Sequence, residues 1–268
     1  MPADAGIVST SLCADAYVLE LAGPGRIAAL SWQAGDAVSA APDWARDLPR
    51  AWSDAERLYT LAPALTVFGP GEGGRTQRLL DRAGLDATEL GWASDFAGVR
   101  ANLESLGAAM ETPARADAAI ADLDVRLARL DIRTRQRAVR PRILYLSASG
   151  GTAGAGTYVD AAIAAAGGIN VMAEAGVTGW PASDPEALLG VEADIVLTSF
   201  FTDGYTSTLN RGLRHAAYRR VLERTTMRAD IPAGDWPCAG PRLIVAAEHI
   251  ADVIDRWVGE AAEWETGE

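Results

Sequence analysis

The amino-acid sequence predicts an α/β protein with two Rossmann-like lobes, each built on a central parallel sheet, joined by a single long α-helix. Three observations support this prediction: one sequence element occurs twice, strand patterns alternate with helix patterns, and one long helical pattern lies near the middle of the chain. We therefore expect an N-terminal lobe at residues 1–112, a connecting helix at 113–140 and a C-terminal lobe at 141–268.

The repeated element begins with Ser-x-x-Glu, at Ser53 to Glu56 and again at Ser183 to Glu186. This pattern is a capping box, in which the Ser side chain caps a helix and the Glu side chain reaches back to the cap N–H. From each Glu an apolar residue recurs at +2, +5, +9 and +11, which predicts a short helix followed by a buried strand. The two Glu residues lie 130 positions apart, about one domain length. Two copies at that offset predict two similar lobes, whereas a solenoid needs three or more repeats.

Strands and helices alternate on both sides of the long helical pattern, which is the signature of parallel sheets covered by helices. Glycine and proline mark the ends of most of these segments. The expected strands are 7–11, 27–31, 65–68, 87–90, 142–147, 195–199 and 230–231. The expected helices, besides those of the two repeats, are 15–21, 75–83, 95–110, 113–138, 157–166, 216–223 and 241–263.

Composition excludes several classes of protein. Of the 268 residues, 49% are hydrophobic and 22% are charged, as in a globular protein, and no apolar run is long enough to cross a membrane. The net charge of −12 argues against nucleic-acid binding, because that affinity depends on Lys and Arg. The first six residues lack the basic and apolar regions of a secretory leader, so the sequence predicts either a cytosolic protein or the mature part of an exported one.

Two cysteines and two histidines are the candidate metal ligands and redox groups. Cys13 and Cys238 lie near opposite ends of the chain, and a disulfide, two separate thiols and ligation of a bound metal complex all stay open. With only His215 and His249, and no Cys-x-x-Cys pattern, a protein zinc site is not expected. Both histidines fall in helical patterns, which favours structural roles.

Glycine-rich loops raise the hypothesis of a nucleotide-dependent enzyme. The loop from Gly69 to Gly74 follows a strand and opens a helix, as a dinucleotide-binding loop does. The acidic residue that should follow about 20 residues later is matched only weakly, by Glu89. Neither this loop nor the one from Gly150 to Gly156 ends in Gly-Lys-Ser/Thr, and no nucleophile elbow or catalytic triad is present. We therefore expect a binding protein with no catalytic residues.

Tryptophan placement is the positive signal for binding. The chain has eight Trp, and five of them fall in expected loops at the ends of strands or helices. Ligands of open α/β sheets bind outside the carboxyl ends of the strands, and Trp offers a large, rigid contact surface. We expect an aromatic-lined cleft formed by Trp32, Trp52, Trp92, Trp180 and Trp236. Packing or surface roles are expected for Trp44, Trp257 and Trp264.

Several motifs together resemble the periplasmic substrate-binding proteins of ABC importers for cobalamin, ferric siderophores and haem, and most closely the cobalamin-binding members. The resemblance covers nearly the whole chain. Its motifs are Ser11-Leu12-Cys13-Ala14-Asp15, Trp52-Ser53-Asp54-Ala55-Glu56, Thr152-Ala153-Gly154, Ala166-Gly167-Gly168-Ile169-Asn170, Gly179-Trp180-Pro181, Asp235-Trp236 and Gly240-Pro241-Arg242.

The resemblance implies roles for single residues. Glu56 and Glu186 match the two lobe-surface glutamates that pair with arginines of the permease dimer. Trp32, Trp52 and Trp180 match aromatic positions of the cleft, and Asp235 matches an acidic position there. Cys13 and Cys238 are expected to face the same cleft.

Two departures leave the ligand open. The loop after Asp235 is one residue shorter than in the cobalamin-binding members and carries Pro237-Cys238 in place of an arginine, and Gly151 replaces another cleft aromatic. In a haem-binding member, Tyr158 or Tyr205 would be the candidate iron ligand.

The resemblance therefore implies a monomeric, periplasmic binding component of an importer, which holds cobalamin or a related corrinoid between its lobes and delivers it to the permease. It implies no cofactor other than the ligand, and a disulfide would persist in the periplasm. The alternatives are a ferric-siderophore or haem carrier of the same family, a nucleotide-dependent α/β enzyme, and a sensor or scaffold that binds a protein through its acidic surface.

Overall fold

The structure is a computed structural model that describes residues 6–36, 38–147, 150–181, 185–199, 215–225, 227–236 and 238–266. Residues 1–124 and 237–242 form one compact unit (unit 1), and residues 125–236 and 243–268 form a second (unit 2). Each unit contains one parallel sheet with helices on its faces, which confirms the predicted fold class. The role of residues 113–140 as a connector stays a prediction.

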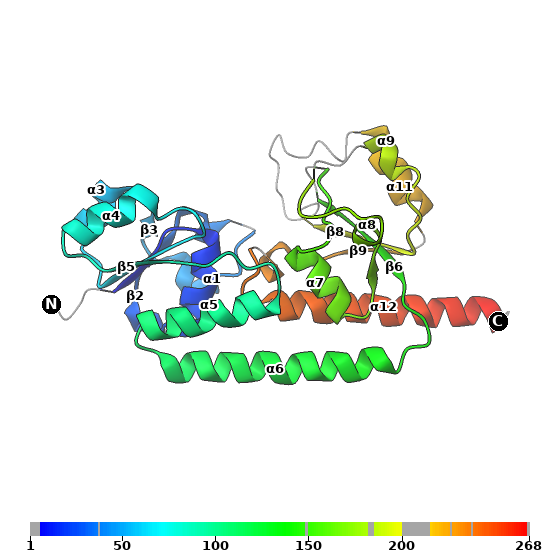
Figure 1. The fold of residues 1–268 in the computed structure, drawn as a ribbon, viewed down its shortest axis with the longest axis horizontal. Coiled ribbons are helices and arrows are strands. Elements are labelled where there is room, and N and C mark those ends of the chain that lie inside the picture. The colour runs from blue at the N-terminus through cyan, green and yellow to red at the C-terminus, as the bar shows by residue number, and fades with distance from the viewer. Residues whose placement is uncertain are drawn as a thin grey trace. The chain divides into compact units, whose positions relative to one another are not determined.

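Unit 1 is built on five parallel strands in the order β3-β2-β1-β4-β5 (Figure 1). Their sequences are short and apolar, and β1, β3 and β4 contribute Val8, Ala51 and Phe68 to a core from which water is excluded. The strands are β1 (Ile7–Ser9), β2 (Ile27–Ser31), β3 (Arg50–Ala51), β4 (Leu65–Phe68) and β5 (Ala87–Glu89).

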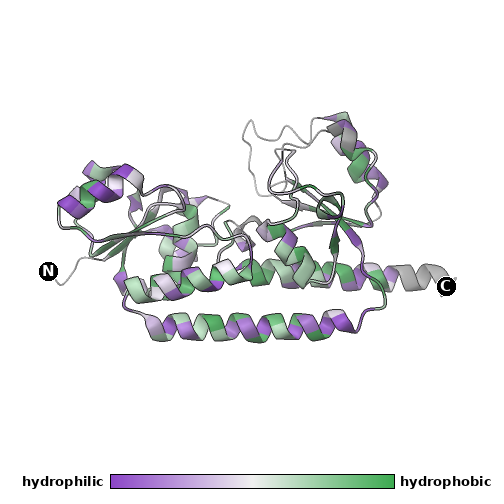
Figure 2. Cartoon of the chain, viewed as in Figure 1, coloured by the Kyte–Doolittle hydropathy of each residue, from purple (hydrophilic) through white to green (hydrophobic). Residues whose placement is uncertain are grey.

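Helices cover both faces of this sheet. Leu58 of α3 and Leu80 of α4 complete the core on one face, while α1 packs against β1, β2 and β4 and against α5. Figure 2 shows the hydrophilic residues that α3 and α4 carry besides these buried leucines. The helices are α1 (Leu12–Leu21), η1 (Pro24–Arg26), η2 (Trp32–Gly35), α2 (Asp43–Arg46), α3 (Ala55–Leu61), α4 (Gly74–Arg82), α5 (Phe96–Ala109) and the start of α6 (Pro113–Arg135).

Unit 2 has four parallel strands in the order β7-β6-β8-β9. One face is covered by helices α8, α9 and α11, whose Val171, Leu188 and Val221 pack on Leu144 and Val196. The elements are β6 (Arg142–Ser147), α7 (Tyr158–Ala165), β7 (Ile169–Asn170), α8 (Val171–Glu174), α9 (Pro185–Leu188), β8 (Ile195–Ser199), α11 (Ala216–Arg224), β9 (Met227–Asp230), η3 (Ala233–Asp235) and α12 (Leu243–Thr266).

Ion pairs join the second half of α6 and the residues just after it to α12. Arg133 contacts Asp252 at 2.7 Å and Asp255 at 2.5 Å, Arg137 contacts Asp255 at 2.6 Å, and Arg126 pairs with Glu248. Partial burial would raise the pKa of Asp255, but hydrogen bonds from Arg137 and Arg133 outweigh it and hold that pKa below its usual range. Ion pairs thus hold α6 against α12.

Two details of the repeated element were predicted wrongly. Asp54, not Ser53, caps α3, because its Oδ1 accepts from the Arg57 N–H at 3.0 Å. Leu61, the apolar residue at +5, is 44% exposed rather than inward. The predicted helix followed by a buried strand is confirmed in both copies, while the second cap, Ser183, lies outside the described residues.

Candidate functional site

Three tryptophans lie along the carboxyl edge of the sheet of unit 1. Trp32 directly follows β2, Trp52 directly follows β3, and Trp92 lies three residues beyond β5. Because all five strands are parallel, the loops after them share one edge. The exposed fractions are 51% for Trp32, 40% for Trp52 and 84% for Trp92. Unit 1 therefore presents a row of exposed indole rings where open α/β sheets bind ligands.

Asp15 of α1 fixes the turn that carries Trp32. Its Oδ1 accepts from the Ser31 N–H at 2.9 Å, and its Oδ2 accepts from the Ser31 hydroxyl at 2.5 Å. The side chain is almost fully buried, and this burial raises the pKa of Asp15 although the hydrogen bonds from Ser31 and Ser9 oppose the shift. Sequence reasoning quoted Asp15 in a motif but assigned it no role.

The raised pKa of Asp15 gives a testable pH dependence. Asp15 contributes stability that is fully present below its unfolded pKa of about 3.9 and declines as the pH rises through the folded pKa. The Asp15→Asn variant lacks this titration, so the free energy of unfolding of the wild type, relative to this variant, should fall between pH 3 and pH 7. Urea denaturation across about pH 3 to 7 measures it. A difference in the free energy of unfolding between wild type and Asp15→Asn that stays constant over this pH range would contradict the prediction. Asp36→Asn, at an exposed carboxylate, is the control.

Asn102 holds the loop of Trp92 in the same way. Its Oδ1 accepts from the Gly91 N–H at 2.9 Å, and its Nδ2 donates to the Gly91 carbonyl at 3.0 Å. The same Nδ2 also donates to the Tyr17 hydroxyl at 3.4 Å. One asparagine on α5 thus pairs with both the N–H and the carbonyl of Gly91, the residue before Trp92. No sequence motif predicts this contact, because the two residues lie on different elements.

The glycine-rich loop after β4 has its backbone donors occupied by the protein's own carboxylates. The Gly69 N–H donates to Glu72, and the N–H groups of Gly71 and Gly73 donate to the two oxygens of Glu89, at 2.7 and 3.0 Å. A phosphate-binding loop needs such N–H groups for its ligand. The carboxylate of Glu89 occupies the N–H groups that a phosphate would need in this loop. This argues against the hypothesis of a nucleotide-dependent enzyme.

Cys13 and Cys238 form a disulfide, with their Cα atoms 5.3 Å apart. Of the three possibilities for these cysteines, a disulfide, two separate thiols or ligands of a metal complex, the structure shows the disulfide. Neither sulfur is therefore a thiolate that could ligate a metal. The bond ties residues 238–242 to the first turn of α1, and the Tyr17 hydroxyl adds a hydrogen bond to the Ala239 carbonyl at 2.8 Å. Burial raises the pKa of Tyr17 to about 12.

In unit 2, Trp180 belongs to an aromatic cluster. Its ring centre lies 4.9 Å from that of Tyr158 and 6.4 Å from that of Tyr145, and Trp180 is 51% exposed. The loop before it pairs with residues 154–155, where a Cβ on Gly154 would lie 2.3 Å from the Val177 carbonyl oxygen. Only glycine fits at this approach, so the small-residue loop brings Trp180 onto Tyr158.

Trp236 and Asp235 differ from the expectation of cleft residues. Trp236 is 1% exposed, stacks edge-to-face on Tyr145 at 5.4 Å and donates to the Ser199 hydroxyl at 2.9 Å. Asp235 is 3% exposed, with Oδ2 3.0 Å from Nδ1 of His249. Both side chains pack inside unit 2, so we omit them from the proposed binding face. His215 caps α11, where its side chain accepts from the Ala217 N–H.

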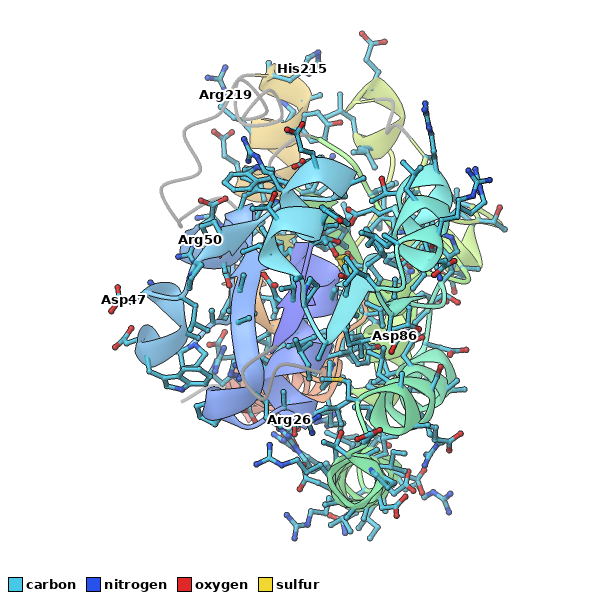
Figure 3. All side chains as sticks on the ribbon, turned by 90° about the vertical axis from the view of Figure 1, so that its left-hand side faces the viewer. Arg26, Asp47, Arg50, Asp86, His215 and Arg219 are labelled. Carbon is cyan, nitrogen blue, oxygen red and sulfur yellow. A yellow bond between two sulfur atoms is a disulfide. The ribbon has the colours of Figure 1, made fainter. Side chains whose placement is uncertain are left out.

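The two glutamates of the repeats are exposed and border surface hollows. Glu56 lies in the first turn of α3, beside a hollow of about 440 Å³ lined by Arg50, Asp54, Arg57, Thr60 and Leu61. Glu186 lies in the first turn of α9, beside a hollow of about 590 Å³ whose lining includes Leu189, His215, Arg219, Arg220 and Glu223. Figure 3 labels Arg50, the first residue of β3, together with His215 at the start of α11 and Arg219 on that helix.

Other features of the described residues bear on the class of protein. They contain no group of three or more His, Cys, Asp or Glu side chains placed to hold a metal ion. None of the helices among them is long and apolar enough to span a membrane. Tyr205, the second candidate iron ligand, lies outside the described residues.

Comparison with known proteins identifies the family. Residues 35–217, more than half of the chain, match the family of periplasmic binding proteins. The chain belongs to the periplasmic binding protein family. Seventy-two residues, 26% of the chain, are 36% identical to a cobalamin-binding protein of Halobacterium salinarum, and this match spans only 20% of that relative's length.

Solved structures share the fold of this family member. The periplasmic heme-binding protein HutB of Vibrio cholerae gives a TM-score of 0.75 at 18% identity, covering 94% of this chain and 99% of that one. The heme-binding protein RhuT from Roseiflexus sp. RS-1 gives 0.74 at 20% identity, covering 93% and 99%. The vitamin B12-binding protein BtuF of Vibrio cholerae gives 0.70 at 19% identity, covering 94% and 96%.

Proposed function

We propose that this periplasmic binding protein is the solute-binding component of an ABC importer, and that its cargo is cobalamin or a related corrinoid. It would bind this cargo in the periplasm and deliver it to the permease, without catalysing a reaction. The observation that carries the proposal is the row of exposed tryptophans at the carboxyl edge of unit 1, with Trp180 of unit 2 as a further contributor. The stretch of similarity to a cobalamin-binding protein adds support.

The dimensions of the row favour a large ligand. Trp52 follows β3, at one edge of the sheet, and Trp92 follows β5, at the other edge. These two strands are four strand spacings apart, so the row extends about 19 Å at roughly 4.8 Å per spacing. A bare oxyanion or metal ion would contact a small part of such a surface, whereas a macrocycle can cover several indole rings. Indole rings bind through apolar area and stacking, which suits a corrinoid with its broad, largely apolar edges.

Haem is the second candidate cargo, and one observation favours it. Tyr158 is half-buried beside the exposed ring of Trp180, so a phenol oxygen lies next to a stacking surface in unit 2. A phenol oxygen at that place can ligate ferric iron, which a corrinoid does not contain. The Tyr158→Phe variant separates the two ligands, since it should lower the affinity for haemin and leave that for cyanocobalamin unchanged.

Variants of the tryptophans test the corrinoid proposal. Trp32→Ala, Trp52→Ala and Trp180→Ala should each weaken cyanocobalamin binding by about tenfold, because each removes a stacking surface worth about 1.4 kcal/mol. Isothermal titration calorimetry measures the dissociation constants. Trp44→Ala is the matched control, since Trp44 is 44% exposed but lies on α2 rather than directly after a strand. Equal losses in the control and the three variants would contradict the proposed binding face.

The importer docks, in this proposal, on the surfaces around Glu56 and Glu186. Both glutamates stand in first helical turns, are exposed, and border hollows large enough to admit side chains of another protein. Carboxylates in such positions suit basic partners, because charge complementarity directs association.

A further inference from the structure

Arg57 touches the Trp52 ring. The Cζ atom of its guanidinium lies 4.3 Å from the ring centre, well within the range of a cation–π contact. Trp52 nevertheless remains 40% exposed, so part of its ring stays available to a ligand. Arg57 is therefore placed to hold the orientation of a tryptophan that the proposed function assigns to the ligand.

The same arginine also lines the hollow beside Glu56. Two arginines border this hollow, and they differ in how they are held. The Arg50 guanidinium donates to the backbone carbonyls of Arg46 and Leu48, which holds it against the end of α2 and the loop that follows. Arg57 Nε lies 3.6 Å from Asp54 Oδ2, longer than a charge-assisted hydrogen bond, and the side chains of both residues are about half exposed. Of the two, Arg57 is the cation that a partner's carboxylate can engage.

We propose that Arg57 links the ligand face and the docking face of unit 1: it positions Trp52 for the ligand, and an acidic side chain of the permease engages it on docking. This inference rests on the proposed function. It requires the permease to present a carboxylate beside the basic group that meets Glu56, so the partner surface has mixed charge. A partner with basic groups only would be repelled by Arg57.

The link has a defined size and direction. A cation–π contact at an exposed site changes an equilibrium by a factor of about two to five. If the permease draws Arg57 from the Trp52 ring, docking lowers ligand affinity by about that factor, and bound ligand lowers docking affinity equally. Arg57 would thus favour release of the ligand at the permease.

The positioning role is tested by ¹⁹F NMR of ligand-free protein labelled with 5-fluorotryptophan. The Trp52 resonance is assigned by its loss in Trp52→Phe. Arg57→Met keeps the length of the side chain and removes the charge, and it should move this resonance while leaving those of the other tryptophans in place. Arg78→Met, at an exposed arginine of α4, is the control and should move none. An unmoved Trp52 resonance in Arg57→Met would overturn the positioning role.

The docking role is tested by fluorescence anisotropy with the importer's permease–ATPase complex in nanodiscs. The chain contains no lysine, so an amine-reactive dye labels the N-terminal amine alone. Arg57→Glu should weaken docking by tenfold or more, on the order of 1.4 kcal/mol, whereas Arg78→Glu should not. Unchanged docking of Arg57→Glu would overturn the engagement of Arg57 by an acidic partner.

Cyanocobalamin titrations with and without this complex measure the link itself. The dissociation constant of the wild type should rise by about two- to fivefold on docking, and that of Arg57→Met should not change. The same rise in Arg57→Met would overturn the link. Failure of cyanocobalamin to bind at all would contradict the corrinoid cargo, while the NMR and anisotropy results would still decide the role of Arg57.

Discussion

Replacing Glu56 and Glu186 together by alanine is expected to abolish uptake of the ligand and to leave its affinity for the isolated protein unchanged. Both carboxylates are exposed and lie in the first turns of helices, at hollows that open to solvent, and neither belongs to the row of tryptophans proposed to bind the ligand. Removing one partner of a charge pair that is buried on docking costs about 2–5 kcal/mol. Two such losses weaken docking by at least about 10³-fold. The binding protein would then no longer occupy the permease.

The measurement combines uptake of radiolabelled cyanocobalamin into proteoliposomes with calorimetric affinity for the same protein. Each single variant should dock with intermediate affinity, because the two contacts are on different helices. The control pair is Glu104→Ala with Glu260→Ala, exposed glutamates on α5 and α12 that should support normal uptake. Loss of ligand affinity in the Glu56/Glu186 variant would show that these residues act on the binding site or the fold instead.

Removing the disulfide by Cys13→Ser with Cys238→Ser is expected to lower the free energy of unfolding by about 2–5 kcal/mol. The bond joins residues 225 positions apart, so in the unfolded chain it closes a very long loop and removes much of its conformational entropy. It also secures a strained segment, because Cys238 and Ala239 have φ angles of 61° and 43° in the left-handed region. For a chain of this length the melting temperature should fall by roughly 4–10 °C.

Calorimetric melting with and without a reductant checks this result. The reductant should lower the melting temperature of the wild type to near that of the double serine variant and should leave the variant unaffected. Tyr17→Phe, which removes the hydrogen bond to Ala239 and the longer one from Asn102 but keeps the disulfide, should cost about 1 kcal/mol and keep the response to reductant. A wild type that melts at the same temperature in both conditions would contradict a stabilising role for the bond.

The longer helices and most apolar strands could be predicted from the sequence to within about three residues, but the strand expected at 230–231 was predicted wrongly, since β9 spans Met227–Asp230. The strands at 27–31, 65–68, 142–147 and 195–199 have the predicted bounds, and α5 differs by one residue at each end. Seven short elements of the described residues were missed, because two to four residues cannot show a period: α2, β3, β7, α8, η1, η2 and η3. The cap of α3 was misassigned because Ser53 and Asp54 are both good caps, and only the path of the chain decides between them.

The candidate site could be predicted where it depends on strand ends and not where it depends on distant partners. Trp32, Trp52 and Trp92 are exposed as expected, since parallel strands carry them to one edge. Trp236 is buried because Tyr145 and Ser199, far away in sequence, provide a stacking surface and an acceptor. The contacts of Glu89, Asn102 and Asp15 with backbone groups of the loops are equally non-local, so no local motif identifies them.

Intrinsic tryptophan fluorescence, titrated with cyanocobalamin and corrected for its absorbance, tests the central claim most directly. Haemin and a ferric siderophore are titrated in parallel. The proposed function predicts saturable quenching by cyanocobalamin at sub-micromolar concentration, reduced in Trp52→Phe and unchanged in Trp44→Phe. Saturation by haemin or the siderophore with no response to cyanocobalamin would contradict the corrinoid cargo, and no response to any of the three would contradict the proposed tryptophan face.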